Sequence, residues 1–131
     1  MSDTPIAVRI TRSNGGVELR HVAASGADQV VQLILELDTV ANVVLELEHP
    51  RRGTLLIDLD RSRATIGLDS LEGVYQYSRR NAPSGHANLV IGGQPTDLDL
   101  PYVLDTATAA EVARAWFAGD ALPPLGEWER Q

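Results

Sequence analysis

The chain has 131 residues, a length typical of one domain that folds around its own core, so we expect a single domain over 1–131. Hydrophobic residues make up 44% and charged residues 22%, a balance that favours a globular protein over a disordered chain. There is no Cys, which excludes disulfides, thiolate nucleophiles and Cys-ligated metals. The start lacks a secretion signal and no apolar run is long enough to span a membrane, so we expect a cytoplasmic protein without a membrane partner.

The net charge is −7, and all eleven basic residues are Arg. This composition argues against the dense basic face that binds phosphates, so we expect no nucleic-acid partner. Residues 97–131 carry seven acids against two Arg and supply most of the imbalance. An acidic surface speeds encounters with a cationic partner, although solubility alone is an equally good explanation.

The first third of the chain predicts a hairpin followed by a helix. Apolar residues alternate on both sides of Asn14-Gly15-Gly16, a sequence that supplies the positive φ of a tight turn. The alternating residues are Ile6, Val8, Ile10, Val17 and Leu19. Ser25 to Asp28 resembles a capped helix start, and the apolar spacing that follows predicts a helix at about 26–37.

From residue 43 the apolar period changes from 3.6 to 2, which predicts strands. Four segments alternate in this way, with turn sequences between them, at 43–48, 54–60, 64–68 and 73–79. Segments this short and this close together indicate an antiparallel meander. A short apolar strand at 87–91 follows and is closed by Gly92-Gly93, after which 94–101 looks extended.

A second helix is predicted at about 107–118. Thr108 and Glu111 have the spacing of a capping box, an apolar stripe follows, and Gly119 suits the residue after the helix. We expect the Pro-containing tail to run back over the body and to bury Trp128. The sequence therefore predicts an α+β fold, mainly an antiparallel sheet made of the N-terminal hairpin and the meander, with both helices packed on one face.

Few residues suggest catalysis. His21, His49 and His86 lack the i, i+3 or i, i+4 spacing that sets two imidazoles on one helix face, and no nucleophile elbow, P-loop or dinucleotide fingerprint is present. We therefore expect no metal, no cofactor, no catalytic residues and no enzymatic activity.

Four acids form the one cluster that merits comparison with an active site. Alternation places Glu46, Glu48, Asp58 and Asp60 on one face of two neighbouring strands, on the hydrated side. Acid–base catalysis needs one of them buried, so that its pKa rises towards neutrality. An ordinary solvated face and a partner-binding face are the two stronger interpretations.

Aromatic residues supply the other candidate contacts. Tyr75 and Tyr77 share a strand face, either the open one, where tyrosine suits an interface, or the core. Trp128, flanked by Glu127 and Glu129, either closes the core or joins the contact surface.

The C-terminal third, NLVIGGQPTDLDLPYVLDTATAAEVARAWFAGDALPPLGEWE, resembles the first-numbered immunity family of bacterial polymorphic toxin systems. The middle, NVVLELEHPRRGTLLIDLDRSRATIGL, is similar to that family's strand pattern, so the resemblance covers about 27–129. The matching positions are Gly92, Gly93, Pro95, Val112, Ala113, Ala115, Phe117, Gly119, Pro123 or Pro124, and Trp128 with Glu127 and Glu129. A Pro-Pro pair replaces the basic turn typical of the family, which leaves the register of Trp128 open.

The resemblance implies a non-enzymatic antidote that binds a cognate toxin, such as a nucleic-acid deaminase or nuclease, and blocks it. On this hypothesis the partner-binding residues are Glu46, Glu48, Asp58, Asp60, Tyr75, Tyr77, Glu127, Trp128 and Glu129. The alternatives are an adaptor module with no toxin partner and, less favoured, a small carboxylate-dependent enzyme.

Overall fold

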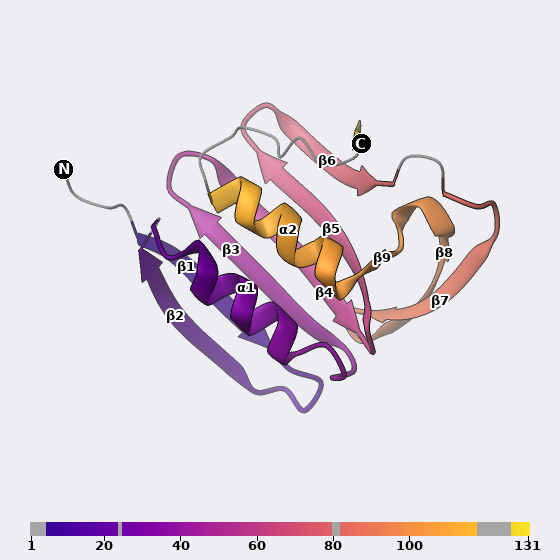
Figure 1. Ribbon diagram of the computed structural model, residues 1–131, viewed down its shortest axis with the longest axis horizontal. Coiled ribbons are helices and arrows are strands. Elements are labelled where there is room, and N and C mark those ends of the chain that lie inside the picture. The colour runs from indigo at the N-terminus through magenta and orange to yellow at the C-terminus, as the bar shows by residue number, and fades with distance from the viewer. Residues whose placement is uncertain (1–4, 24, 80–81, 118–126) are drawn as a thin grey trace.

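A twisted antiparallel sheet forms the body of the protein in the computed structural model, which describes residues 5–23, 25–79, 82–117 and 127–131 (Figure 1). The sheet contains β1 (Pro5–Thr11), β2 (Val17–Ala23), β3 (Val43–His49), β4 (Gly53–Asp60), β5 (Arg63–Ser70), β6 (Gly73–Ser78) and β10 (Glu127–Arg130). Their spatial order is β10-β6-β5-β4-β3-β1-β2, and the short β9 (Leu104–Asp105) also pairs with β5. The hairpin and meander predicted from alternation are confirmed.

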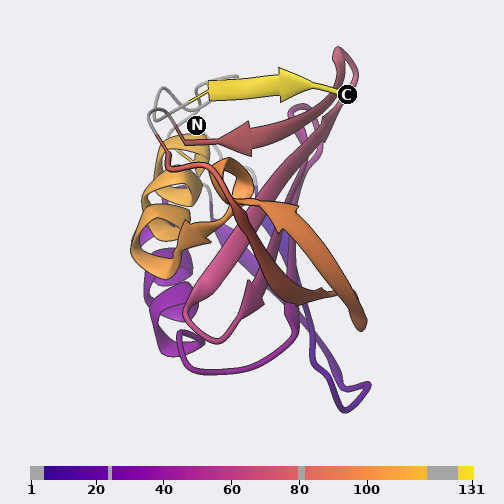
Figure 2. The same cartoon turned by 90° about the vertical axis from the view of Figure 1, so that its right-hand side faces the viewer.

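Two helices, α1 (Ala27–Glu36) and α2 (Thr106–Phe117), lie side by side on one face of this sheet (Figures 1 and 2). Each turns an apolar stripe towards the strands, and the alternate apolar residues of β1, β3, β4 and β5 meet them. Trp116 is the largest fully buried side chain. The predicted α+β architecture, with both helices on one face, is therefore confirmed.

The helix starts differ from the expected caps. Gly26 precedes α1 and gives no side-chain cap. At α2 the capping oxygen comes from Asp105, whose Oδ1 accepts a hydrogen bond from the Thr108 N–H at 2.7 Å. Thr108 therefore lies within the first turn of the helix, and the predicted Thr108–Glu111 capping box is wrong. The hydrogen bonds from Thr108 hold the pKa of Asp105 below its usual range.

A second, smaller hairpin consists of β7 (His86–Ile91) and β8 (Gln94–Asp99), and a 3-10 turn, η1 (Leu100–Tyr102), follows it. Gly92 and Gly93 form its two-residue loop, both with positive φ, as the right-handed twist of a hairpin favours. The pair forms its own two-stranded sheet. Figure 2 shows its tip on the side of the main sheet away from the helices.

The C-terminal segment returns to the body as predicted. β10 pairs antiparallel with β6, with Trp128 opposite Tyr77. The two rings meet edge to face with centroids 5.2 Å apart, and Trp128 is half-buried against the core. The positions Gly119, Pro123 and Pro124 lie outside the described residues.

Candidate partner-binding surface

The sheet face away from the helices is the candidate site, and its side chains stand in rows because the strands are in register. One row crosses all seven strands; the strand register places in it Leu19, Arg9, Glu46, Leu56, Gly67, Gln76 and Glu129. The next row contains His21, Ala7, Glu48, Thr54, Asp69 and Val74. Directly opposite residues in a sheet lie close enough for their side chains to act together.

We define the acidic face as six residues of these two rows, Glu46, Glu48, Asp69, Glu129, Leu56 and Val74. Leu56 keeps 38% of its surface exposed and Val74 keeps 47%, so both offer apolar contact area. Glu48, Asp69 and Glu129 are exposed as well. The acidic face therefore combines negative charge with apolar contact area.

Asp58 shares the predicted face with Glu46 and Glu48 but is not hydrated. It is 8% exposed, and its carboxylate accepts hydrogen bonds from the Thr65 hydroxyl and the Gly92 N–H. Burial raises the pKa of Asp58 to about 6, and the charge of Glu46 adds to this effect, while the two hydrogen bonds oppose it.

Asp60, 5% exposed, is also buried. Its Oδ1 accepts a hydrogen bond from the Asn42 N–H at 3.3 Å, and its Oδ2 accepts one from the Val90 N–H at 2.9 Å. The side chain of Asn42 in turn accepts the Gly93 N–H at 3.1 Å. Asp60 and Asn42 thus join the end of β4, the loop before β3 and the β7–β8 hairpin.

The prediction that all four acids face water is therefore wrong for Asp58 and Asp60. Both lie on the expected face, but the β7–β8 hairpin covers that end of it, and their oxygens satisfy backbone N–H groups of the hairpin. A buried carboxylate that accepts several hydrogen bonds is a structural group. Glu46 and Glu48 remain outside the covered end.

The two tyrosines lie on the opposite face. Tyr77 is 3% exposed within the core, and Tyr75 packs partly buried against it. Their strand face, left open between core and interface by the sequence, is the core-facing one, on the same side of the sheet as the helices. Trp128 shares that face because it stands opposite Tyr77.

Glu129 lies on the opposite face of the sheet from Trp128, because the side chains of neighbouring strand residues alternate. Glu129 stands opposite Gln76 on the acidic face and accepts a hydrogen bond from the Tyr102 hydroxyl, which raises the pKa of that phenol. The backbone of Glu127 pairs with Ser78, and its side chain lies outside the described residues. Of the predicted contact residues, the structure thus gathers Glu46, Glu48 and Glu129 on one surface.

Sequence reasoning missed three members of the acidic face and the half-buried Asn42, which joins the loop before β3 to the β7–β8 hairpin. Leu56 was the clearest signal, because it is an apolar residue on the polar side of an alternating strand. Asp69 and Val74 join it only through the strand register. The role of Asn42 was hidden because its partners are distant in sequence.

The described residues also bear on the enzyme and metal alternatives. Within residues 5–23, 25–79, 82–117 and 127–131, no three His, Asp or Glu side chains are placed to hold a metal ion. A half-open cavity of about 190 Å³ lies between the β3–β4 and β5–β6 turns, and neither buried aspartate lines it.

None of the described helices combines the length and apolarity that crossing a membrane requires. No family model matches the chain, and a search of curated proteins finds no matching sequence.

Proposed function

We propose that this protein is an immunity protein that binds a cognate bacterial toxin and covers its active site with the acidic face. The observation that carries the proposal is that face itself, where Glu46 lies opposite exposed Leu56, and Asp69, in the same row as Glu48, lies opposite exposed Val74. The resemblance over about 27–129 supports the same function.

The proposed toxin acts on nucleic acid as a deaminase or nuclease, and such an enzyme needs a cationic cleft for the phosphates of its substrate. Carboxylates on a flat, wide surface can take the place of those phosphates and exclude the substrate at the same time. Their long-range field also speeds the encounter, an effect that salt weakens. The antidote acts in the cytoplasm of the cell that makes the toxin.

Charge alone does not give the required affinity. An antidote must hold its toxin at nanomolar concentration or below, which corresponds to about −12 kcal/mol, whereas an exposed ion pair contributes about 0–1 kcal/mol. Leu56 and Val74 supply apolar area beside these carboxylates, and apolar side chains carry much of the affinity of an interface. We expect a standard interface of about 1,600 Å² in which these two residues set the dissociation rate.

The test compares two variants with the same net charge. One removes three carboxylates from the acidic face by Glu46→Gln, Glu48→Gln and Asp69→Asn. The other removes three exposed carboxylates from the helices by Asp28→Asn, Glu36→Gln and Glu111→Gln. Association with the toxin domain encoded beside the gene is then measured across a salt series.

We expect the sheet variant to associate at least about tenfold more slowly at low salt, with the gap closing as salt rises, and the helix variant to follow the unmodified protein. Equal effects of the two variants would show that only total charge matters. No effect of the sheet variant would reject the acidic face as the contact.

Two other functions give different results. An adaptor module shares the surface but has no toxin gene beside it, so the gene neighbourhood separates it from an antidote. A small carboxylate-dependent enzyme has one observation in its favour, the raised pKa of Asp58. However, the oxygens of Asp58 hold the β7–β8 hairpin, so Asp58→Asn tests that function directly: an enzyme would lose turnover, and an antidote would still protect.

A further inference from the structure

β2 is an edge strand of the main sheet. Its inner edge pairs with β1 along seven residues, and no strand of the described parts of the chain pairs with its outer edge. In Figure 1 it forms the margin of the sheet, with α1 lying over the face and not beyond the strand. A regular edge strand without Pro presents a row of backbone donors and acceptors to another strand.

The register identifies which backbone groups point outward. The Arg12 N–H donates to the Gly16 carbonyl at 2.9 Å, so this pair is a hydrogen-bonded one. Bonded and non-bonded pairs alternate along an antiparallel ladder, so the even-numbered residues of β2 bond to β1. The N–H and C=O groups of Val17, Leu19 and His21 therefore point away from the sheet. Pro5 has no N–H to donate. It stands opposite Ala23 in a non-bonded pair, where the pattern requires no hydrogen bond from Pro5 to β2.

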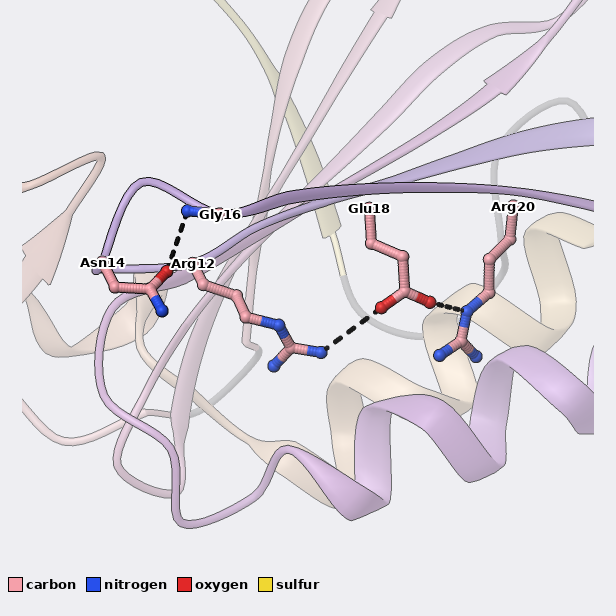
Figure 3. Close-up of polar contacts among 5 residues, drawn as sticks. All are labelled: Arg12, Asn14, Gly16, Glu18 and Arg20. Atoms are coloured by element: carbon pink, nitrogen blue, oxygen red, sulfur yellow. Dashed lines mark hydrogen bonds and ion pairs between the residues drawn. The ribbon is translucent and has the colours of Figure 1, made fainter.

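The side chains of β2 also alternate. Val17 and Leu19, which are 62% and 55% exposed, lie on the face away from the helices. Glu18 and Arg20 lie on the other face, where Arg20 Nε donates to the Glu18 carboxylate and Arg12 lies 3.6 Å from it (Figure 3). The outer edge thus carries apolar side chains on one face and one charge of each sign on the other.

We propose that β2 pairs antiparallel with β2 of a second copy of this chain, in a register centred on Leu19. Leu19 then faces Leu19 of the second copy, and Val17 faces His21. Glu18 faces Arg20 in both directions, which gives two symmetric pairs of opposite charge. Every outward backbone group of these three odd-numbered residues meets an outward group of the other copy.

Neighbouring registers are disfavoured. A register centred on Glu18 sets that carboxylate against its own copy, and one centred on Arg20 does the same with the guanidinium, so each places like charges directly opposite. A register shifted by one residue would pair odd-numbered residues of one copy with even-numbered residues of the other. The outward backbone groups of one strand would then meet residues whose backbone groups point inward. Of these registers, the one centred on Leu19 sets Glu18 opposite Arg20 twice and opposes no like charges.

A cationic toxin drawn to the acidic face has no attraction to this hairpin, because residues 5–23 contain three Arg and one Glu. A second copy carries the same net charge there, so the Glu18–Arg20 complementarity of the register centred on Leu19, and not net charge, selects it. The proposed dimer leaves the acidic face of each copy open, so it does not depend on the proposed function.

The test measures the molecular mass of the full chain by analytical ultracentrifugation over a concentration series, with circular dichroism to confirm folding. We expect a monomer–dimer equilibrium that Glu18→Arg or Arg20→Glu each weakens by about tenfold or more, because either change makes both pairs repulsive. A mixture of the two variants should form a heterodimer, since every pair is then again opposite in charge. The double variant Glu18→Arg with Arg20→Glu should dimerise like the unmodified chain, and Glu36→Arg on α1 serves as the control.

A single cysteine tests the register, because the chain has none of its own. Leu19→Cys should give a disulfide-linked dimer under mild oxidation, and Val17→Cys should not. A chain that stays monomeric at every concentration would overturn the proposal, as would a dimer that the charge variants leave intact. If Leu19→Lys instead weakens toxin binding by a monomeric chain, the edge receives a strand of the toxin and the second copy is rejected.

Discussion

Asp58 should make the stability of the protein depend on pH in a way that its amide variant does not share. The change is Asp58→Asn, which keeps the size of the side chain and an oxygen to accept the Gly92 N–H and the Thr65 hydroxyl. The amide carries no charge, so burying it costs far less free energy than burying the ionised carboxylate. The variant therefore isolates the effect of burying that charge.

The sign follows from the raised pKa. Burial moves the pKa of Asp58 from an ordinary value of 3.8 to about 6 in the folded protein. The stabilisation that the protonated carboxyl group contributes is fully present below the pKa of Asp58 in the unfolded chain. It is lost as the pH rises through about 6, the pKa in the folded protein. A pKa difference of about two units at 1.36 kcal/mol per unit corresponds to about 3 kcal/mol, most of which is lost between pH 4 and pH 8.

Urea unfolding followed by tryptophan fluorescence at pH 4, 6 and 8 measures this effect. We expect Asp58→Asn to match the unmodified protein at pH 4 and to exceed its free energy of unfolding by about 3 kcal/mol at pH 8. Glu48→Gln, which removes an exposed carboxylate on the same sheet face, should follow the unmodified protein at both ends. A variant that is destabilised equally at pH 4 and pH 8 would refute the argument, because the ionised form would then be the preferred acceptor.

Three other substitutions test individual contacts that stabilise the fold. Asp60→Ala leaves two backbone N–H groups without their acceptor and should lower the free energy of unfolding by roughly 2–4 kcal/mol, with faster amide exchange in β7. Asp105→Ala removes the cap of α2 and should reduce stability by about 1 kcal/mol in urea; this difference should shrink as the pH falls through the lowered pKa of Asp105. Gly53→Ala should lower the melting temperature sharply, because φ is +91° and the new methyl group would lie 2.1 Å from a backbone oxygen of β5. Gly93→Ala, also at positive φ but with open space around it, is the matched control and should have the smaller effect.

Alternation and helical spacing were sufficient to predict the main architecture. The pattern around Val43, Leu45 and Leu47 reports burial on one face, and these three side chains are fully buried against the helices. The apolar stripe of 107–118 likewise reports the packing of α2. Such local periodicity depends only on neighbours in the chain, so it can be recognised without knowing the tertiary contacts.

The covering of the sheet by β7–β8 was not predictable in this way. The sequence showed a short strand, two glycines and an extended segment, but nothing local says that this hairpin lies across the end of β4. Asp58 and Asp60 therefore look like solvated acids, because alternation reveals which face a residue occupies and not what covers that face. For the same reason the strand register was needed to place Asp69 and Val74 in the same row as Glu48.

Protection of living cells is the most direct test of the claim that this protein neutralises a toxin through its acidic face. The toxin domain encoded beside the gene is expressed together with the protein, with the sheet variant lacking the carboxylates of Glu46, Glu48 and Asp69, or with the helix variant of equal charge. We predict survival and co-purification with the unmodified protein and the helix variant, and death with the sheet variant. Death in the presence of the unmodified protein, or full protection by the sheet variant, would contradict the account.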